Sequence, residues 1–367
     1  MKIKDKHYRT IWLHPENEQI VRVIDQRLLP HRFEIMDLKT VDQVCFAIKE
    51  MVVRGAPLIG ATAAWGMYLS TFEMPGNCER DFYFEDVYRK LIQTRPTAVN
   101  LKWALDEMLQ SITGNDSLEE SRWYAKKRAE WICDDDVKAN KKIGEFGLPL
   151  IEEIAATKNN EPVNILTHCN AGWLATVDYG TALSPIYLAH EKGIKIHVWV
   201  DETRPRNQGA HLTAWELLQA GIPHTLIADN AGGHLMQNNK VDLCLVGTDR
   251  TSINGDVCNK IGTYIKALAA FDNQIPFYVA APSSSIDWNM RNAFAEIKIE
   301  ERNPDEIKYV QGLIHGKIDS VLISPQDTGA LNYAFDITPA KYVTGLITEN
   351  GICEASEEGL RNLFPNK

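Results

Sequence analysis

Short apolar runs recur through the second half of the chain, and they constrain its fold more than any other feature. Each run ends at a polar residue or a turn signal, and the runs lie at 163–167, 196–200, 225–228, 243–246 and 277–281. Segments with helical character separate them, at 179–191, 210–220 and 260–271. Strands that alternate with helices at this spacing favour a parallel, doubly wound sheet, and continuous apolar runs are typical of strands covered on both faces. The sequence therefore predicts an α/β fold with a Rossmann-like parallel sheet.

The first half of the chain has a different pattern. From about residue 42 to residue 154 the apolar residues recur at helical spacing, as in the stripe Val44, Ile48 and Met51. Short alternating apolar positions between residues 8 and 36 indicate a small β element before these helices. The polar stretch 157–162 is the best candidate for a domain boundary. We therefore expect a smaller, mainly helical N-terminal domain over residues 1–155 and a domain built on the parallel sheet over residues 156–367.

Composition restricts the kind of partner that the chain can bind. Its formal net charge is -10, whereas non-specific binding to nucleic acid needs a basic face. No stretch approaches the length of a charge-free membrane span, and no secretory segment is visible. The 7 cysteines show no C-x-x-C spacing, which is consistent with free thiols in a reducing compartment. We expect a cytoplasmic protein that binds neither nucleic acid nor a membrane.

Reactive side chains stand where the predicted strands end. Cys169, Asp201, Asp229 and Asp249 all follow an apolar run directly. In an open α/β sheet, ligands bind outside the carboxyl ends of the strands. These side chains should therefore gather along one edge of the sheet, although they are far apart in the sequence.

The segment Thr167-His168-Cys169-Asn170-Ala171-Gly172 lies at a predicted turn from strand to helix. A helix N-terminus favours the thiolate form of a Cys, which could then act as nucleophile, acid or base. The alternative is an inert core thiol, because a Cys among apolar residues usually packs as a small hydrophobe. For His168 a structural, hydrogen-bonded role is the commoner one.

Two further segments could hold an anion. Arg54-Gly55-Ala56-Pro57 would begin a helix whose free N–H groups and positive dipole end suit a phosphate, with a plain helix-to-helix turn as the alternative. Asn259-Lys260 stands at the predicted start of another helix, where a Lys opposes the helix dipole; such a local conflict is expected where a site needs a cation. On this interpretation Asn259 and Lys260 hold a phosphate while Asp249 exchanges protons nearby. A capping Asp and a solvated Lys are the alternative.

The loop 201–209 combines two acids, two arginines and two amides. It is either a cradle for a polar substrate or a solvated loop. Asp229 could simply cap the helix that follows it. The chain has no phosphate-binding G-x-x-x-x-G-K-[ST] loop, no G-x-G-x-x-G after a predicted strand, no H-E-x-x-H and no His/Cys cluster with metal spacing. We therefore expect no cofactor and no metal.

Read together and in order, these motifs resemble the methylthioribose-1-phosphate isomerase family, in the superfamily that also holds the regulatory subunits of eukaryotic initiation factor 2B. The resemblance runs from about residue 40 to residue 350. The segments that carry it are 54–60, 95–101, 167–172 with 175–176, 201–204 with 208–210, 212–217, 229–230, 249–250, 254–264 and 332–339. The run Asn259-Lys260-Ile261-Gly262-Thr263-Tyr264, in register with the others, is the most specific of them.

The resemblance implies a reaction and a set of site residues. The family converts an aldose 1-phosphate to a ketose 1-phosphate in methionine salvage, here 5-methylthioribose 1-phosphate to 5-methylthioribulose 1-phosphate. It implies Cys169 and Asp249 as the catalytic pair, no cofactor, a small N-terminal domain beside a Rossmann-like domain, and a homodimer. The residues that would hold the sugar phosphate are Arg54, Gly55, Ala56, Arg95, Gln208, Asn259 and Lys260.

Two other functions remain open at this level. A sister isomerase of 5-deoxyribose 1-phosphate or ribose 1,5-bisphosphate would keep the same catalytic pair, and a regulatory subunit of the initiation factor 2B type would lack it. The sequence also departs from the family pattern beside the predicted site, where Trp173, Thr248 and Cys258 stand in place of smaller residues. These departures bear on the identity of the substrate more than on the class of reaction.

Overall fold

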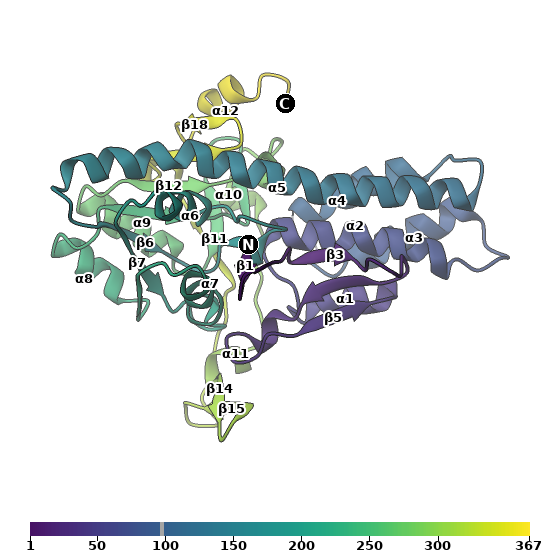
Figure 1. The fold of residues 1–367 in the computed structure, drawn as a ribbon, viewed down its shortest axis with the longest axis horizontal. Coiled ribbons are helices and arrows are strands. Elements are labelled where there is room, and N and C mark those ends of the chain that lie inside the picture. Colours follow the sequence, from purple (N-terminus) through teal and green to yellow (C-terminus); the bar gives the residue numbers. More distant parts are fainter. Residues whose placement is uncertain (96–98) are drawn as a thin grey trace.

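The computed structural model, which describes residues 1–95 and 99–367, is built around a seven-stranded sheet in the second half of the chain (Figure 1). The strand order is β18-β17-β12-β9-β6-β7-β8, and all neighbours pair in parallel except β17 and β18. The strands are β6 (Val163–Thr167), β7 (Ile196–Asp201), β8 (His224–Ile227), β9 (Leu243–Val246), β12 (Phe277–Ala280), β17 (Gly345–Thr348) and β18 (Gly351–Cys353). The predicted parallel sheet is confirmed, and each predicted strand is found within one residue of its expected ends.

Helices cover both faces of this sheet. Along β6, Ile165 packs with the helices α5 (Leu118–Thr157) and α6 (Ser184–Glu191), whereas its neighbour Leu166 packs with α8 (Ala231–Gln237) and α9 (Thr263–Asp272). Successive strand residues point to opposite faces, so an unbroken apolar run is what a sheet covered on two sides requires. The central β9 is buried at every position, while the edge strand β8 is largely exposed.

The helices of this half deviate from the predicted bounds. The predicted helix 179–191 begins only at Ser184. The predicted helix 210–220 is divided into a π-helical turn, η3 (Gly209–Thr213), and α7 (Ala214–Gln219). The predicted helix 260–271 begins at Thr263, because the residues before it form the strand β11 (Val257–Lys260).

The first half contains the small β element and the helices that the sequence predicts. The strands β3 (Ile11–Leu13), β4 (Val21–Ile24) and β5 (Ile35–Leu38) form an antiparallel sheet, and β1 (Lys2–Ile3) pairs with β2 (Lys6–His7). The helices are α1 (Val41–Lys49), α2 (Ala56–Glu73), α3 (Arg80–Ile92) and α4 (Val99–Ile112). Helix α2 is buried nearly all round, and α4 approaches so closely that a Cβ at Gly60 would lie 2.8 Å from the carbonyl oxygen of Asn100.

The long helix α5 connects the two halves. It packs against α2 and α4 in the first half and against α6 in the second, and it runs along both (Figure 1). Five residues separate the end of α5 from the start of β6. The domain boundary near residue 155 stays a prediction. No helix among the described residues is both long and apolar enough to span a membrane.

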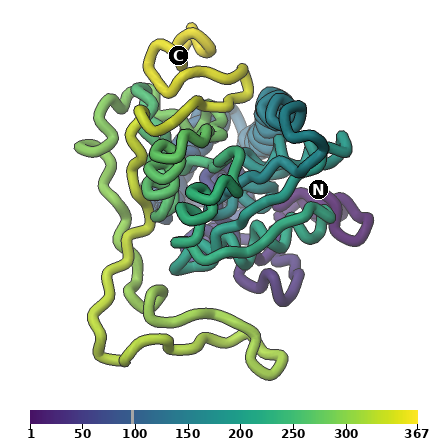
Figure 2. The backbone as a smooth tube through the Cα atoms, turned by 90° about the vertical axis from the view of Figure 1, so that its left-hand side faces the viewer, coloured from purple at the N-terminus to yellow at the C-terminus, as the bar shows by residue number. Residues whose placement is uncertain are grey.

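A second, four-stranded sheet lies beside the main one, and the sequence does not predict it. Its order is β13 (Ile286–Asp287), β10 (Arg250–Ser252), β11 and β16 (Phe335–Thr338). Between β13 and β16 the chain forms the short helices α10 (Ala293–Glu296) and α11 (Asp305–Lys308) and the hairpin β14 (Tyr309–Ile314) and β15 (Lys317–Leu322), which projects from the body (Figures 1 and 2). The chain ends with α12 (Glu357–Leu363).

Candidate active site

The strand order of the main sheet reverses between β6 and β9, and a cavity lies beyond the carboxyl ends of these two strands. From β6 the sheet continues through β7 to β8, and from β9 through β12 to β17. Such a reversal leaves a crevice, because the connections leave the two neighbouring strands in opposite directions. Cys169 follows β6 and Asp249 follows β9, and both line this cavity. The structure thus brings together the two side chains that the sequence placed at separate strand ends.

Most of the other predicted site residues line the same cavity or the two pockets that adjoin it. The cavity itself is lined by Arg54, Gly55, Ala56 and Asn259 in addition to the pair. Gln208 shares a neighbouring pocket with Arg54, and Arg95 shares another with Ala56 and Asp249. The guanidinium of Arg95 lies 3.3 Å from Glu300. Residues 96–98 of the segment 95–101 lie outside the described part of the chain.

The backbone of Cys169 is held in a conformation that few residues other than glycine adopt. Its φ is 64°, which costs energy for a residue with a side chain. Two threonine hydroxyls offset that cost: the N–H of Cys169 donates to Thr203 Oγ1 at 2.8 Å, and Thr213 Oγ1 donates to the Cys169 carbonyl at 2.7 Å. The predicted helix N-terminus at this thiol is wrong, because a strained loop and a 3-10 turn, η2 (Trp173–Ala175), separate it from α6.

Asp249 occupies the opposite wall of the cavity, in the short connection between β9 and β10. Its N–H donates to the carbonyl of Cys258 at 3.1 Å, which ties the connection to β11. Among the residues that the structure describes, no hydrogen bond or ion pair reaches its carboxylate. The neighbouring Arg250 forms an ion pair with Asp287 instead. The carboxylate is therefore available to a ligand in the cavity.

Lys260 is a buried cation without an ion-pair partner among the described residues. It ends the strand β11, so the prediction that it begins a helix is wrong: β11 pairs with β16, with Lys260 opposite Phe335. Its ammonium lies 4.7 Å from the Phe335 ring centroid. Burial lowers the pKa of Lys260, and the charges of Cys169 and Asp249 raise it. The positive charges of Arg95 and Arg54 lower the pKa of Lys260 further, and together the three cations favour an anion at this site.

The start of α2 closes the cavity, as the sequence predicts. Gly55 precedes the helix with a φ of 92°, and a Cβ there would lie 2.3 Å from the carbonyl oxygen of Ala175. Only glycine fits at such a position. Pro57 lies in the first turn, where its missing N–H costs nothing. The free N–H groups of this first turn add partial positive charge beside Arg54.

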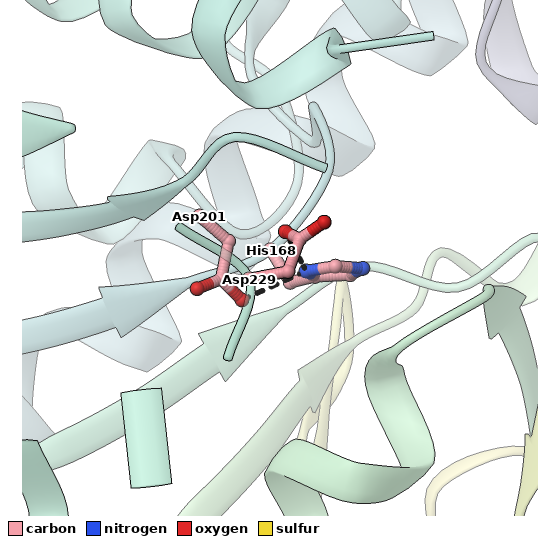
Figure 3. Close-up of side chains that lie close together, drawn as sticks. All are labelled: His168, Asp201 and Asp229. Carbon is pink, nitrogen blue, oxygen red and sulfur yellow. Dashed lines mark hydrogen bonds and ion pairs between the residues drawn. The ribbon is translucent and has the colours of Figure 1, made fainter. Parts of the chain in front are cut away.

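His168, Asp201 and Asp229 form a cluster next to Cys169 (Figure 3). The atoms that could ligate a metal lie within 4.8 Å of one another, yet each carboxylate already has protein donors. Asp201 accepts from His168 Nδ1 at 2.8 Å and from Lys266 Nζ at 3.0 Å, and His168 Nε2 lies 2.8 Å from the carbonyl of Ile261. An ammonium on a carboxylate and a ring engaged at both nitrogens do not fit a cation site. We interpret the cluster as a structural network that anchors the end of β6.

Asp229 does not cap the helix that follows it, so that interpretation is wrong. Its carboxylate accepts from the backbone N–H groups of Thr203 and Arg204, at 2.8 Å each, and thereby fixes the loop after β7. The sequence predicts this loop as a possible part of the site. It does not predict that Thr203, Thr213 and Asn170 hold the backbone and side chains of the site in place. Their hydrogen bonds join segments 34 to 46 residues apart in the chain, so no local pattern in the sequence marks these residues.

The three departures from the family pattern have different surroundings. Trp173 is 1% exposed and packs into the core with Trp215, with ring centroids 6.3 Å apart, so it does not line the cavity. Thr248 does line it and donates to the carbonyl of Cys258 at 3.2 Å. Cys258 itself is buried and lines the pocket that contains Arg95; burial raises the pKa of its thiol.

Comparison with known proteins agrees with this geometry. The profile of the initiation factor 2 subunit family matches residues 52–355. A methylthioribose-1-phosphate isomerase from Desulfatibacillum aliphaticivorans is 56% identical over 367 residues, with 100% of both chains covered. The enzyme of that name from Rhizobium meliloti is 57% identical over 369 residues, again with 100% of both covered.

Two solved structures are also similar. The crystal structure of 5-methylthioribose 1-phosphate isomerase from Pyrococcus horikoshii OT3 matches with a TM-score of 0.83 and 41% identity, covering 99% of this chain and 97% of that one. The translation initiation factor eIF-2B subunit delta from A. fulgidus matches with a TM-score of 0.79 and 37% identity, covering 98% and 100%. On this sequence and structural similarity over its full length, the chain belongs to the methylthioribose-1-phosphate isomerase family, within the initiation factor 2 subunit family.

Proposed function

We propose that this protein is an isomerase that converts 5-methylthioribose 1-phosphate to 5-methylthioribulose 1-phosphate, with Cys169 and Asp249 as its acid–base pair. The observation that carries the proposal is the single cavity that both residues line, with Arg54 and Asn259 in its wall. The relatives that share this chain's full length carry the name of that enzyme.

The substrate class explains why two separate proton-exchanging groups are needed. The anomeric carbon of an aldose 1-phosphate bears a phosphate ester, so the ring cannot open to a free aldehyde by the ordinary route. The enzyme must protonate the ring oxygen, break the ring C–O bond and move a hydrogen from C2 to C1. Two groups that differ in environment suit these steps. Both residues line the cavity, but Cys169 is 7% exposed, whereas Asp249 is half-buried.

We assign Cys169 the proton exchange at the reacting carbons and Asp249 the exchange at a sugar hydroxyl. Turnover in deuterated water tests the assignment, because a proton removed from C2 and returned to C1 mixes with solvent. Deuterium at C1 of the product supports the proton route. Its complete absence would favour a hydride shift and would remove the carbon-directed role of Cys169.

The phosphate would be held by the cationic side of the cavity. Arg54 and the N-terminal turn of α2 line the cavity and offer a guanidinium and free N–H groups. Asn259 also lines the cavity, and its amide donates to Thr263 Oγ1 at 3.0 Å. The buried ammonium of Lys260, the next residue of β11, would add a positive charge. In the pocket beside Arg54, Gln208 has a buried side-chain oxygen without a hydrogen-bond partner among the described residues, which would accept from a sugar hydroxyl and not from the phosphate.

Turnover assays with three sugar phosphates test the function as a whole. Purified protein should convert 5-methylthioribose 1-phosphate with a higher kcat/KM than 5-deoxyribose 1-phosphate or ribose 1,5-bisphosphate. Preference for the bisphosphate would replace the proposed substrate and keep the reaction class. The similarity to a structure named as an initiation factor subunit makes a non-catalytic regulatory role the second candidate. Failure to convert any of the three sugars would favour it.

We also propose that the protein acts as a cytoplasmic homodimer, on the basis of the family resemblance. Sedimentation equilibrium at micromolar concentration checks the assembly, and a mass of one chain would contradict it.

A further inference from the structure

Helix α7 buries a carboxylate directly behind the cavity, in a place that the proposed reaction does not use. Glu216 is 1% exposed and has donors on both of its oxygens. Oε1 accepts from Asn170 Nδ2 and from the N–H of Leu174, at 2.9 Å each. Oε2 accepts from the N–H of Trp173 at 3.0 Å and from the Tyr187 hydroxyl at 2.6 Å. A carboxylate can be buried only when donors satisfy its oxygens, and this one has four of them.

The bonds of Glu216 determine which way the amide of Asn170 faces. An amide has an acceptor end and a donor end, and its orientation follows from its partners. Leu174 N–H can only donate, so Oε1 of Glu216 is an acceptor, and Asn170 must turn its NH2 toward it. This leaves Asn170 Oδ1 facing the guanidinium of Arg54, which donates to it. The orientation is the same for either protonation state of Glu216, because the N–H groups of Leu174 and Trp173 can only donate and a proton on Oε2 would be donated to the Tyr187 hydroxyl.

We propose that Glu216 is a positioning residue that orients the Asn170 amide and thereby holds Arg54 toward the cavity. Arg54 and Asn170 both line the cavity, and Glu216 lies behind them, out of reach of a ligand. The loop has closed around the carboxylate so tightly that a Cβ at Gly172 would lie 1.7 Å from Glu216 Oε2. The inference rests on the proposed role of Arg54 in binding the sugar phosphate.

Glu216→Gln is the sharpest single test. The new NH2 meets a backbone N–H in either orientation, that of Leu174 at the Oε1 position or that of Trp173 at the Oε2 position. With the oxygen at Oε2, where the Tyr187 hydroxyl also donates, the NH2 meets Asn170 as well. Asn170 then reverses and turns its own NH2 toward the Arg54 guanidinium, which also only donates. We expect KM to rise by about 100-fold, with a smaller change in kcat, because a displaced binding group can cost that much. The exposed Glu191→Gln variant is the control for the chemical change itself and should match the wild type.

A double variant distinguishes positioning from a general structural role. In Glu216→Gln with Asn170→Asp, the new carboxylate accepts from the Gln NH2 at one oxygen and from Arg54 at the other. The link to Arg54 is restored, with the negative charge at position 170 instead of 216, while the N–H of Leu174 stays without an acceptor. Asn170→Asp alone places two carboxylates against each other and should be the worst variant. We expect the double variant to recover at least tenfold in KM relative to either single one. A merely structural defect would not be repaired by a second substitution.

Two results would overturn the inference: a KM for Glu216→Gln within twofold of the wild type, or a double variant no better than the single ones. If Glu216→Gln does not fold, Asn170→Ser removes the bridge to Arg54 while Glu216 keeps its other donors, and the same rise in KM is expected. Crystal structures of these variants show the position of Arg54 without any assay. If the wild type converts none of the sugars, the proposed function is wrong. The crystal structures would still show whether Glu216 positions Arg54, so the two proposals can fail separately.

Discussion

The two walls of the cavity are built in different ways. Around Cys169 the loop is buried, its backbone is strained, and hydroxyls from Thr203 and Thr213 hold it in place. Around Asp249 the connection is short and one backbone bond ties it to β11, while its carboxylate stays unpartnered among the described residues. The surrounding hydrogen bonds therefore fix the position of the thiol, whereas the carboxylate is free to bind the substrate. Substitutions on the two sides should therefore have unequal consequences.

Removing either reactive group should have the largest effect. Cys169→Ala and Asp249→Asn are each expected to lower kcat by about 1,000-fold, within the range that proton transfer contributes to catalysis. The melting temperature should change little, because neither side-chain head group has a hydrogen-bond partner among the described residues. The exposed Cys78→Ala and Asp319→Asn variants are the matched controls in steady-state kinetics. Unchanged turnover in both catalytic variants would end the assignment.

Lys260→Met should separate function from stability. Loss of the buried ammonium is expected to raise KM by about 100-fold, since charged partners of a phosphate contribute strongly to its binding. Burial lowers the pKa of Lys260 from 10.5, so the unfolded chain holds this proton more tightly than the folded one. Between the lowered value and 10.5 the wild type therefore gains stability as the pH rises.

The Met variant should lack that gain and should melt at a higher temperature near neutral pH. Thermal denaturation across pH and initial-rate kinetics measure the two effects, with the exposed Lys141→Met variant as control. A variant that loses both affinity and stability would show that the ammonium is a structural requirement instead.

Substitutions of the supporting threonines test the contrast between the walls most directly. Thr203→Val leaves the Cys169 N–H without an acceptor, and Thr213→Val removes the donor to its carbonyl. We expect each to lower kcat about tenfold and to cost about 1–3 kcal/mol of stability. Thr248→Ala on the Asp249 side, which removes one bond to the Cys258 carbonyl, should stay within about twofold. Equal effects on the two sides would contradict the comparison.

A carboxylate of α5 gives the Cys169 wall a pH dependence. Asp136 accepts from the N–H of Val177 at 2.7 Å, and burial raises its pKa to about 7 from 3.8. The folded state then binds this proton more tightly than the unfolded state, so stability falls as the pH rises through that window. In urea unfolding, the free energy of unfolding of the wild type should fall between pH 5 and pH 8 by about 2–3 kcal/mol more than that of the Asp136→Asn variant. The exposed Asp134→Asn variant should behave as the wild type does; identical slopes in all three would contradict the assignment.

Local patterns in the sequence were enough to identify the main sheet but not the second one. The run at 243–246 is apolar throughout because both faces of β9 are covered, and this can be read without a structure. The strand β11 is different: its residues Cys258, Asn259 and Lys260 carry no strand pattern. They are extended because they pair with β16, where Asn259 lies opposite Asp336. Because the pairing partner is distant in the chain, the residues of β11 carry no local pattern that indicates a strand. The sequence therefore predicted the start of a helix at this position.

Local patterns in the chain specify three features: the alternation of strands and helices, the strand ends at which Cys169 and Asp249 stand, and the glycine that α2 needs at residue 55. These features follow from the period of apolar residues and from backbone sterics, which act over a few residues. Two others appear only in the folded molecule: Lys260 is a buried strand residue, and a carboxylate on α7 faces the loop after β6. Both side chains are buried by segments that are distant in the chain. Their burial therefore depends on how the whole molecule packs, and local sequence patterns do not encode it.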